Sequence, residues 1–409
     1  MSNAVRTFEY KSRDATGKLV KGKLDAATEG AVVSKLRVMG LAPVAIKETV
    51  AGTGLQREIS FGGGKPVPLK DLAVLSRQMS TMTSAGLSLL KTLTILGEQT
   101  ANKKLAGIMA RVSQDVETGS SFSQALAKHP IDFPPIMISM VRAGEAGGFL
   151  DSALDAIATN FEKESNLRST IKSALTYPVM VLLMSFVAVI LMLVFIVPVF
   201  KNMFESLGGG LPVPTQILVN LSENMVWIIP VVVVILVSST LWWRANKNTE
   251  QVRSVFDPLK LRLPVFGGLF KKIAVARFTR NFANMIGAGV PILQALSVVG
   301  ETSGNWVMEK ATKNVADAVR QGRSIAEPLA LETVFPPMVV QMIAVGEDSG
   351  AMEVMLNKVS DFYDAEVKAS TEALTSLIEP LMIAFLGVVI GGMVVALYLP
   401  IFSIATAIK

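Results

Sequence analysis

The sequence contains no cysteine, a single histidine and only 18% charged residues. Without cysteine, disulfides, thiolate metal sites and cysteine nucleophiles are excluded. His129 precedes a proline and is expected to be a surface loop residue. The mean hydropathy of +0.48 is too high for an ordinary soluble protein and indicates a membrane protein with sizeable water-exposed parts. The net charge of +6, with no aromatic and basic stripe, favours membrane lipid over nucleic acid as a partner.

Three stretches are long and apolar enough to cross a bilayer, for which about 20 residues suffice. The 28 residues of 173–200 carry no charge. The 20 residues of 224–243 are also uncharged and end in a tryptophan pair typical of the headgroup level. After Glu379 no charge appears until Lys409, so a third span is predicted at 377–405. The first residues lack the apolar core of a cleavable signal peptide.

The charges beside these spans predict their orientation, because Lys and Arg near span ends are retained in the cytoplasm. The segment 201–223, expected as an external loop, has one Lys and two Glu. The segment 244–272 has seven basic and two acidic residues. Both large polar regions are therefore expected in the cytoplasm and the C-terminus outside.

Two long segments match each other at a shift of 203 residues, which becomes 202 further along. In the first copy Leu72, Leu75 and Met79 lie on one face of a predicted helix, and the shifted positions are also apolar. The paired residues include Arg77 with Arg280, Gly86 with Gly289, Asn102 with Asn305, Gly144-Glu145 with Gly346-Glu347, Pro178 with Pro380 and Pro198 with Pro400. One single-residue deletion reconciles the two registers, so we interpret the pattern as a duplication.

The predicted fold is a mainly α, polytopic membrane protein with a tandem parallel repeat. Each copy is a helical bundle followed by one span, with bundles at 69–172 and 244–376. Because both copies run outward, a pseudo-two-fold axis along the membrane normal is expected. The pattern of polar and apolar residues in 1–50 predicts a small ββαβ module. The glycine-rich segment 51–68 is typical of a linker.

Arranged in this way, the chain resembles the PilC/GspF family of inner-membrane platform proteins of type IV pilus and type II secretion machines. The motifs that carry the resemblance are "FEYKSRDATGKLVKGKLDA", the paired "AGLSLLKTL" and "AGVPILQAL", the paired "GEAGG" and "GEDSG", and "TYPVM" with "IEPLM". The resemblance implies a non-enzymatic scaffold of the bacterial inner membrane. It also implies a hexameric cytoplasmic ATPase, pilin or pseudopilin helices and other machine subunits as partners, and a small homo-oligomer, with a dimer favoured.

The repeated turns are the first candidate site. Glycine at a helix end and proline at a helix start predict a tight turn between two helices. The glutamate recurs in both copies, and two interpretations stay open: structural support by capping or by a basic neighbour, and direct contact with a partner. The turn residues are Gly144, Glu145 and Gly148 in the first copy and Gly346, Glu347 and Gly350 in the second.

The ends of the outward spans are the second candidate site. Prolines there remove backbone donors and are expected to bend or weaken each span. Glu379 stands where the first copy has Tyr177, and either an interfacial position or a polar contact to the bundle or to pilin would explain it. The span residues are Tyr177, Pro178, Pro198, Glu379, Pro380 and Pro400. Arg77 and Arg280 are hypothetical contacts to the ATPase.

Several kinds of chemistry have no support in the sequence. A phosphate-binding loop would need a GxxxxGK[ST] pattern, whereas Lys65 precedes a proline. The spans contain no aspartate of the kind a prepilin peptidase needs. Glu145 and Glu347 lack the oxygen neighbours that hard cations require. No cofactor, metal or catalytic residue is therefore expected. A type II secretion platform remains the alternative function, and a small oligomeric transporter a remote one.

Overall fold

The computed structural model describes residues 6–13, 19–26, 29–38, 42–48, 66–206 and 211–407. The chain divides into two units, 1–65 and 66–409, which are treated separately below. Most of the linker expected at 51–68 lies outside the described residues.

The N-terminal unit contains a three-stranded antiparallel sheet in the order β2-β1-β3. Tyr10 of the central strand is opposite Gly22 on one side and Ile46 on the other. The helix contacts β3 and buries Val32 and Leu36, one turn apart on one face. The elements are β1 (Arg6–Arg13), β2 (Leu19–Ala26), α1 (Glu29–Val38) and β3 (Ala42–Glu48).

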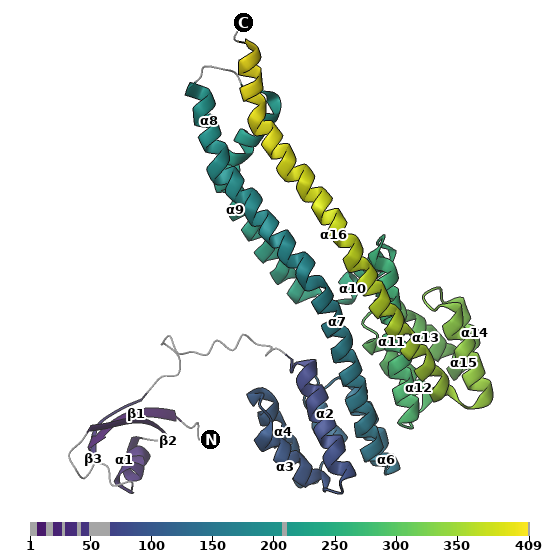
Figure 1. Ribbon diagram of the computed structural model, residues 1–409. Coiled ribbons are helices and arrows are strands. Elements are labelled where there is room, and N and C mark those ends of the chain that lie inside the picture. Colours follow the sequence, from purple (N-terminus) through teal and green to yellow (C-terminus); the bar gives the residue numbers. More distant parts are fainter. Residues whose placement is uncertain are drawn as a thin grey trace. The chain divides into compact units, whose positions relative to one another are not determined.

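The second unit is helical and contains the same succession of helices twice (Figure 1). The first copy consists of α2 (Leu69–Ser84), α3 (Leu89–Gln99), α4 (Lys103–Glu117), α5 (Phe122–Ala127), α6 (Pro135–Gly147) and α7 (Leu150–Leu191), then the π-helix η1 (Met192–Ile196) and α8 (Val197–Ser206). The second consists of α11 (Phe266–Gly287), α12 (Ile292–Thr302), α13 (Trp306–Arg320), α14 (Ala326–Leu331), α15 (Pro337–Ser349) and α16 (Met352–Ala407). Between them lie α9 (Val213–Asn246) and α10 (Glu250–Arg262).

Equivalent residues begin equivalent helices. Asn102 accepts hydrogen bonds from two amides at the start of α4, at 3.0 and 3.2 Å, and Asn305 does the same for α13, at 2.9 and 3.4 Å. Pro135 and Pro337 occupy the first positions of α6 and α15, where a missing amide hydrogen costs nothing.

A single hydrophobic core runs through both bundles. The apolar face predicted for α2 is buried, with Leu72, Leu75 and Met79 at most 2% exposed. In α11 the ring of Phe278 packs edge-on against Phe335 at 4.8 Å. The first turns of α7 and α16 belong to the same core through Leu154, Ile157, Phe161, Leu356, Val359 and Tyr363.

Among the described residues, three helical stretches are long and apolar enough to cross a membrane: 150–204, 213–246 and 352–402. The predictions of a mainly helical chain with three candidate spans are confirmed. The boundaries expected at 172/173 and 376/377 are not helix ends, because α7 and α16 run without interruption from bundle into span (Figure 1).

The expectation that 201–223 forms a loop is wrong for most of its length. α8 extends to Ser206 and α9 begins at Val213. A charged residue does not by itself end a helix, and here Lys201 of α8 pairs with Glu223 of α9 at 2.6 Å. Residues 207–210 lie outside the described part of the chain.

Candidate functional site

The repeated Gly-Glu turn joins α6 to α7 and α15 to α16. Gly148 and Gly350 end the first helix of each pair with φ of +75° and +68°, a left-handed conformation that favours glycine. Gly144 and Gly346 lie where the two helices meet. A Cβ on Gly144 would stand 2.8 Å from the Cβ of Ala153, and one on Gly346 would stand 2.9 Å from the backbone of α16. Glycine therefore permits the close crossing in both copies.

The two turn glutamates cap short helices of their own bundles. Glu145 accepts hydrogen bonds from the backbone amides of Phe122 and Ser123 at 2.5 and 3.0 Å. Glu347 accepts from the amide of Ile325 at 2.8 and 2.9 Å, and from the next amide at 3.3 Å. A carboxylate stabilises a helix N-terminus because free amides and the helix dipole both favour negative charge there. Each turn thus fastens the last two helices of a copy to the short helix before them.

An ion-pair network joins the two copies just before the uncharged run of α7. Glu164 accepts hydrogen bonds from Arg277 of α11 at 2.6 and 3.1 Å and from Arg168 of its own helix at 2.8 Å. Arg280 of α11 lies 3.6 Å from Glu164 and also donates to Asp364 of α16. One carboxylate of the first copy is therefore bound to arginines of the second.

The pKa of Glu164 reports which effect dominates this network. Burial alone would raise the pKa, but the guanidiniums of Arg277 and Arg168 outweigh it and hold the pKa below its usual value. Glu164 is therefore ionised at neutral pH. In Asp364 burial wins over Arg280, and the pKa is raised.

Two further contacts cross between the copies. The side-chain amide of Asn160 donates to Asn281 at 2.9 Å, and both residues are buried. Lys163 pairs with Asp361 at 2.8 Å. The sequence contained a signal for this interface, since Arg277 has Val74 as its counterpart 203 residues earlier. A charge that is present in one copy and absent from the other indicates a contact that the duplication by itself does not explain.

The structure changes the interpretation of the two paired arginines. Arg280 is 3% exposed in its side chain and engaged by Asp364 and Glu164, so it acts inside the chain and not as an ATPase contact. Arg77 donates to Glu162 and Asp155 of α7 and is 38% exposed. In both copies, the arginine ties the first helix of the bundle to the helix that continues into the span.

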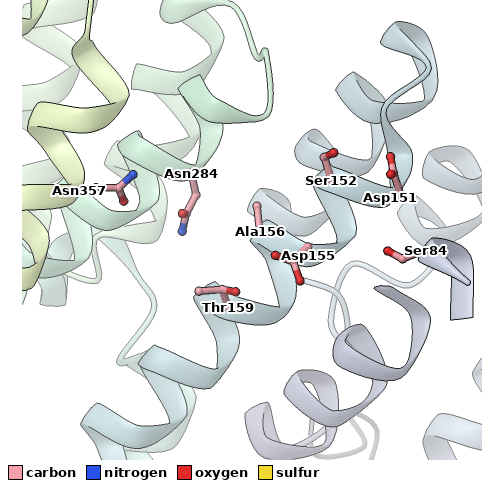
Figure 2. Close-up of a pocket in the computed structure, with 8 residues that line it drawn as sticks. All are labelled: Ser84, Asp151, Ser152, Asp155, Ala156, Thr159, Asn284 and Asn357. Carbon is pink, nitrogen blue, oxygen red and sulfur yellow. The ribbon is translucent and has the colours of Figure 1, made fainter. Parts of the chain in front are cut away.

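A polar cleft of about 410 Å³ lies between residues of the two copies at the turn end of α7 (Figure 2). Figure 2 shows Asn284 and Asn357 of the second copy facing Asp155 and Thr159 of the first. Asp155 and Asn357 are equivalent positions at the shift of 202, so the cleft lies where the two copies face each other. The copies also touch near the turns, because α6 packs against α11 and α12 and one hydrophobic core includes both bundles.

Pro198 leaves a backbone carbonyl without its helical partner, and α9 supplies one. In η1 the amide of Val197 reaches back five residues to Met192. Pro198 has no N–H with which to continue this pattern to Leu193. Instead the hydroxyl of Ser222, on α9, donates to the carbonyl of Leu193 at 2.5 Å.

The second copy repeats the arrangement at Pro400. The carbonyl four residues earlier, that of Ala396, accepts a hydrogen bond from the hydroxyl of Thr215 on α9. Thr215 and Ser222 are buried and stand seven residues apart, on one face of α9. The middle span therefore bonds to both outward spans at their prolines. Neither hydroxyl was predicted from the sequence, although two small polar residues seven positions apart near a span are a signal that could have identified them.

The residues at the start of the spans lie within continuous helices. Tyr177 is exposed and Pro178 buried in α7, whereas Glu379 and Pro380 of α16 are both exposed. Within the part of the chain that the structure describes, Glu379 has no hydrogen-bonding or ion-pair partner. Its carboxylate faces the surroundings of the helix.

Among the described residues, no group of three His, Asp or Glu side chains is placed to hold a metal ion. Burial and the nearby Arg111 lower the pKa of His129, so the imidazole is neutral at pH 7.

The capping geometry predicts unequal losses when the glutamates are removed. Both short helices also have a serine cap, since Ser121 accepts from the amide of Gln124 at 3.2 Å and Ser324 accepts from the amide of Glu327 at 3.3 Å. In α5 the side chain of Gln124 completes a reciprocal capping box, whereas in the described part of α14 this return bond is not formed. Glu347→Ala is expected to destabilise α14 by about 1–2 kcal/mol, and Glu145→Ala to destabilise α5 by less. Hydrogen exchange over 122–127 and 325–331 measures both, and equal protection in the two variants would contradict the assignment.

The ion-pair network predicts a pH-dependent contribution from Glu164. Glu164→Gln is expected to lower the free energy of unfolding by about 1.5–3 kcal/mol at pH 7. Because the folded pKa is depressed, the stabilisation is present above the unfolded value of 4.5 and is lost as pH falls through the folded pKa. Thermal unfolding in detergent measures it.

Glu162→Gln is the control, since Glu162 pairs with Arg77 within one copy and is 41% exposed. Its loss is expected to stay below about 1 kcal/mol. A Glu164 variant no less stable than this control would rule out the network as the link between copies.

The hydrogen bond from Ser222 to the carbonyl of Leu193 predicts that the stability lost on removing Ser222 depends on the presence of Pro198. Ser222→Ala is expected to cost about 1 kcal/mol in the natural chain, because the carbonyl of Leu193 is left without a donor. In a Pro198→Ala background the backbone amide at 198 can serve that carbonyl, so the same substitution should cost little. A double-mutant cycle from unfolding midpoints measures the difference, and identical losses in both backgrounds would refute the explanation.

A known protein-family model matches each of the two copies of the repeat. The family model "Type II secretion system (T2SS), protein F" matches residues 75–198 and 278–400, and the model of its N-terminal domain matches 1–47. The two matched ranges begin 203 residues apart and end 202 apart, which are the shifts found in the sequence.

Relatives match over nearly their whole length. The type IV pilus assembly protein PilC of Myxococcus xanthus is 41% identical, over 99% of this chain and 97% of its own. PilC of Thermus thermophilus is 43% identical, over 97% and 98%. Type II secretion system protein F of Vibrio cholerae is 30% identical, over 96% and 97%. The family resemblance is confirmed: this chain belongs to the type II secretion system protein F family, which includes the type IV pilus assembly protein PilC.

Proposed function

We propose that this chain is the inner-membrane platform protein of a type IV pilus machine. It would couple a hexameric cytoplasmic ATPase to the insertion or extraction of pilin subunits. The observation that carries the proposal is the identity of 41–43% to two PilC proteins over almost the whole chain, against 30% to a protein F of a secretion system. In this role the chain is a non-enzymatic scaffold that transmits motion.

The long helices are suited to that task. α16 has 56 residues, a length of about 84 Å, and its first turns are part of the bundle core. α7 is continuous in the same way. A force applied to a bundle therefore acts on the same helix that lies in the membrane, with no hinge loop between them.

The contacts between the copies favour motion of the pair as one body. Glu164 and its arginines join α7 to α11, and an apolar cluster containing Leu167, Leu269 and Val367 joins α7, α11 and α16 closer to the spans. At the far end α9 bonds to both outward spans. ATP hydrolysis in the partner would turn or tilt this body as a whole and displace a neighbouring pilin helix.

The basic residues beside the spans support an orientation with both bundles in the cytoplasm and the C-terminus outside. The N-terminal α+β module would also lie in the cytoplasm, where the other machine subunits meet it. A homo-oligomer, with a dimer favoured, would surround the pilin. Of the two arginines considered as ATPase contacts, only Arg77 stays in the proposal, because it is partly exposed.

Glu379 is the proposed polar contact to a pilin helix. Its carboxylate is exposed at the start of the third span, and the first copy has Tyr177 there. An exposed charge at that depth is costly unless it reaches water or a polar partner. A platform protein of a type II secretion system is the second candidate, supported by the 30% identity to protein F.

The test is complementation of a strain from which the gene has been deleted. Loss of surface fibres, restored by the natural chain, supports the pilus function, whereas intact fibres with lost protein secretion support the alternative. Intact fibres and intact secretion would overturn both.

The same strain tests the transmission of force through α7. Lys172→Pro removes one helical hydrogen bond between bundle and span, at a cost of about 3 kcal/mol, and Lys172→Ala keeps the helix. With equal amounts of protein in the membrane, the proline variant should fail to restore fibres and the alanine variant should restore them. Full fibre assembly by the proline variant would show that the helical hydrogen bond lost at position 172 is not required.

A further inference from the structure

Large apolar side chains are exposed where α10 meets α11, outside the three candidate spans. They are Val255, Phe256, Leu259, Leu263, Val265 and Phe266. Val255 and Leu259 lie one turn apart on the same face of α10 and are 63% and 54% exposed. Such a contiguous patch marks a surface that meets something apolar.

The opposite face of α10 is polar and is bound to the second bundle. Arg253 pairs with Glu309 of α13 at 2.7 Å, and buried Asp257 accepts from the amide of Trp306 at 3.0 Å. A helix at a water-exposed surface turns its apolar face inward. Since α10 does the reverse, its outer face is suited to an apolar environment and not to water.

The position of α10 identifies that environment. Trp243 ends the uncharged run of α9, where tryptophan typically marks the headgroup level. Its ring packs edge-on against Phe256 at 5.0 Å, and the Lys260 amine lies 5.9 Å from its centre. α10 therefore folds back on the end of the span and lies at the same depth as Trp243.

The turn that follows α10 directs two more apolar side chains outward. Val265 has φ +73° and ψ −51°, and the amide of Phe266 donates to the carbonyl of Pro264 at 2.9 Å, which makes a strained γ-turn. Gly267 packs against the Leu261 carbonyl, where a Cβ would be 2.3 Å away. A β-branched residue in this conformation is unusual, and such strain concentrates at functional positions.

Charge around the patch is complementary to anionic lipid. Arg244, Lys247 and Arg262 are exposed, and among the described residues their side chains have no partner. The acidic Asp257 is neutralised by Lys260 at 2.8 Å, and Glu250 is the other acidic residue of α10. Phosphate headgroups at this depth would meet a basic rim around an apolar centre.

We propose that α10 and the α10–α11 turn form a membrane-surface anchor. The apolar side chains enter the boundary between headgroups and acyl chains, and the basic rim binds anionic lipid phosphates. α10 lies outside both matched ranges of the repeat. The membrane would thereby hold the second bundle at a fixed depth. In the orientation proposed above, the leaflet is the cytoplasmic one.

Because the chain has no cysteine, single nitroxide labels can be introduced directly. The variants Val255→Cys and Val265→Cys report on the patch. Val354→Cys, 52% exposed at the start of α16, is the matched control in the second bundle. The full chain is reconstituted in phosphatidylethanolamine vesicles with phosphatidylglycerol, and collisions with oxygen and with a water-soluble nickel chelate are compared.

At 255 and 265 oxygen collisions should exceed those with the chelate several-fold, and at 354 the order should reverse. Frequent chelate collisions at 255 would overturn the proposal, and so would shielding from both reagents, the result for a protein partner. Val255→Cys lies in regular helix, so its result stands even if Val265→Cys disturbs the turn. In the chain with its natural basic residues, the depth of the labels should depend on phosphatidylglycerol, and replacing Arg244, Lys247 and Arg262 by Gln should remove this dependence. If the depth does not depend on phosphatidylglycerol in the natural chain, the contact with lipid phosphates is overturned.

Discussion

No water reaches the hydrocarbon core of a bilayer, so every backbone amide and carbonyl there needs a partner within protein. Long helices meet most of this requirement, and α7 and α16 continue into their bundles by beginning in the bundle core. Where prolines interrupt the bonding at the far ends, hydroxyls from α9 provide the missing donors. The middle span therefore does more than return the chain: it connects the two outward spans at equivalent points.

The duplication gives both copies the same fold, and the positions at which their residues differ make the two halves unequal. The equivalent glycine turns, asparagine caps and glutamate contacts give both copies the same bundle. Arg277 occurs in the second copy only and binds Glu164 of the first, so an exact repeat would lose this contact. Glu379 also differs from its counterpart in the first copy, which is Tyr177. The two halves of the chain are thus alike in fold and different in what surrounds them.

Local signals made much of this predictable. Gly148 and Gly350, with φ near +70°, lie where glycine after an apolar helical stretch predicted a turn. The spans and the repeat followed from uncharged runs and from paired residues. The burial of Arg280 was not predictable, because its partners Asp364 and Glu164 are 84 and 116 positions away and its charge suggested the surface. The helical structure of 201–206 and 213–223 was missed because the charges of Lys201 and Glu223 suggested helix ends, whereas the two side chains pair with each other after the chain has folded back.

The central claim is that the two copies form one rigid body with their spans. Its most direct test is a distance between nitroxides at Glu117 of α4 and Arg320 of α13, which are equivalent exposed positions in the two bundles. Double electron–electron resonance is recorded on the full chain in lipid nanodiscs, alone and with the partner ATPase turning over ATP. The account predicts one narrow distance distribution that does not change with turnover. A second population, or a shift of several ångströms during ATP hydrolysis, would show that the bundles move against each other and would contradict it.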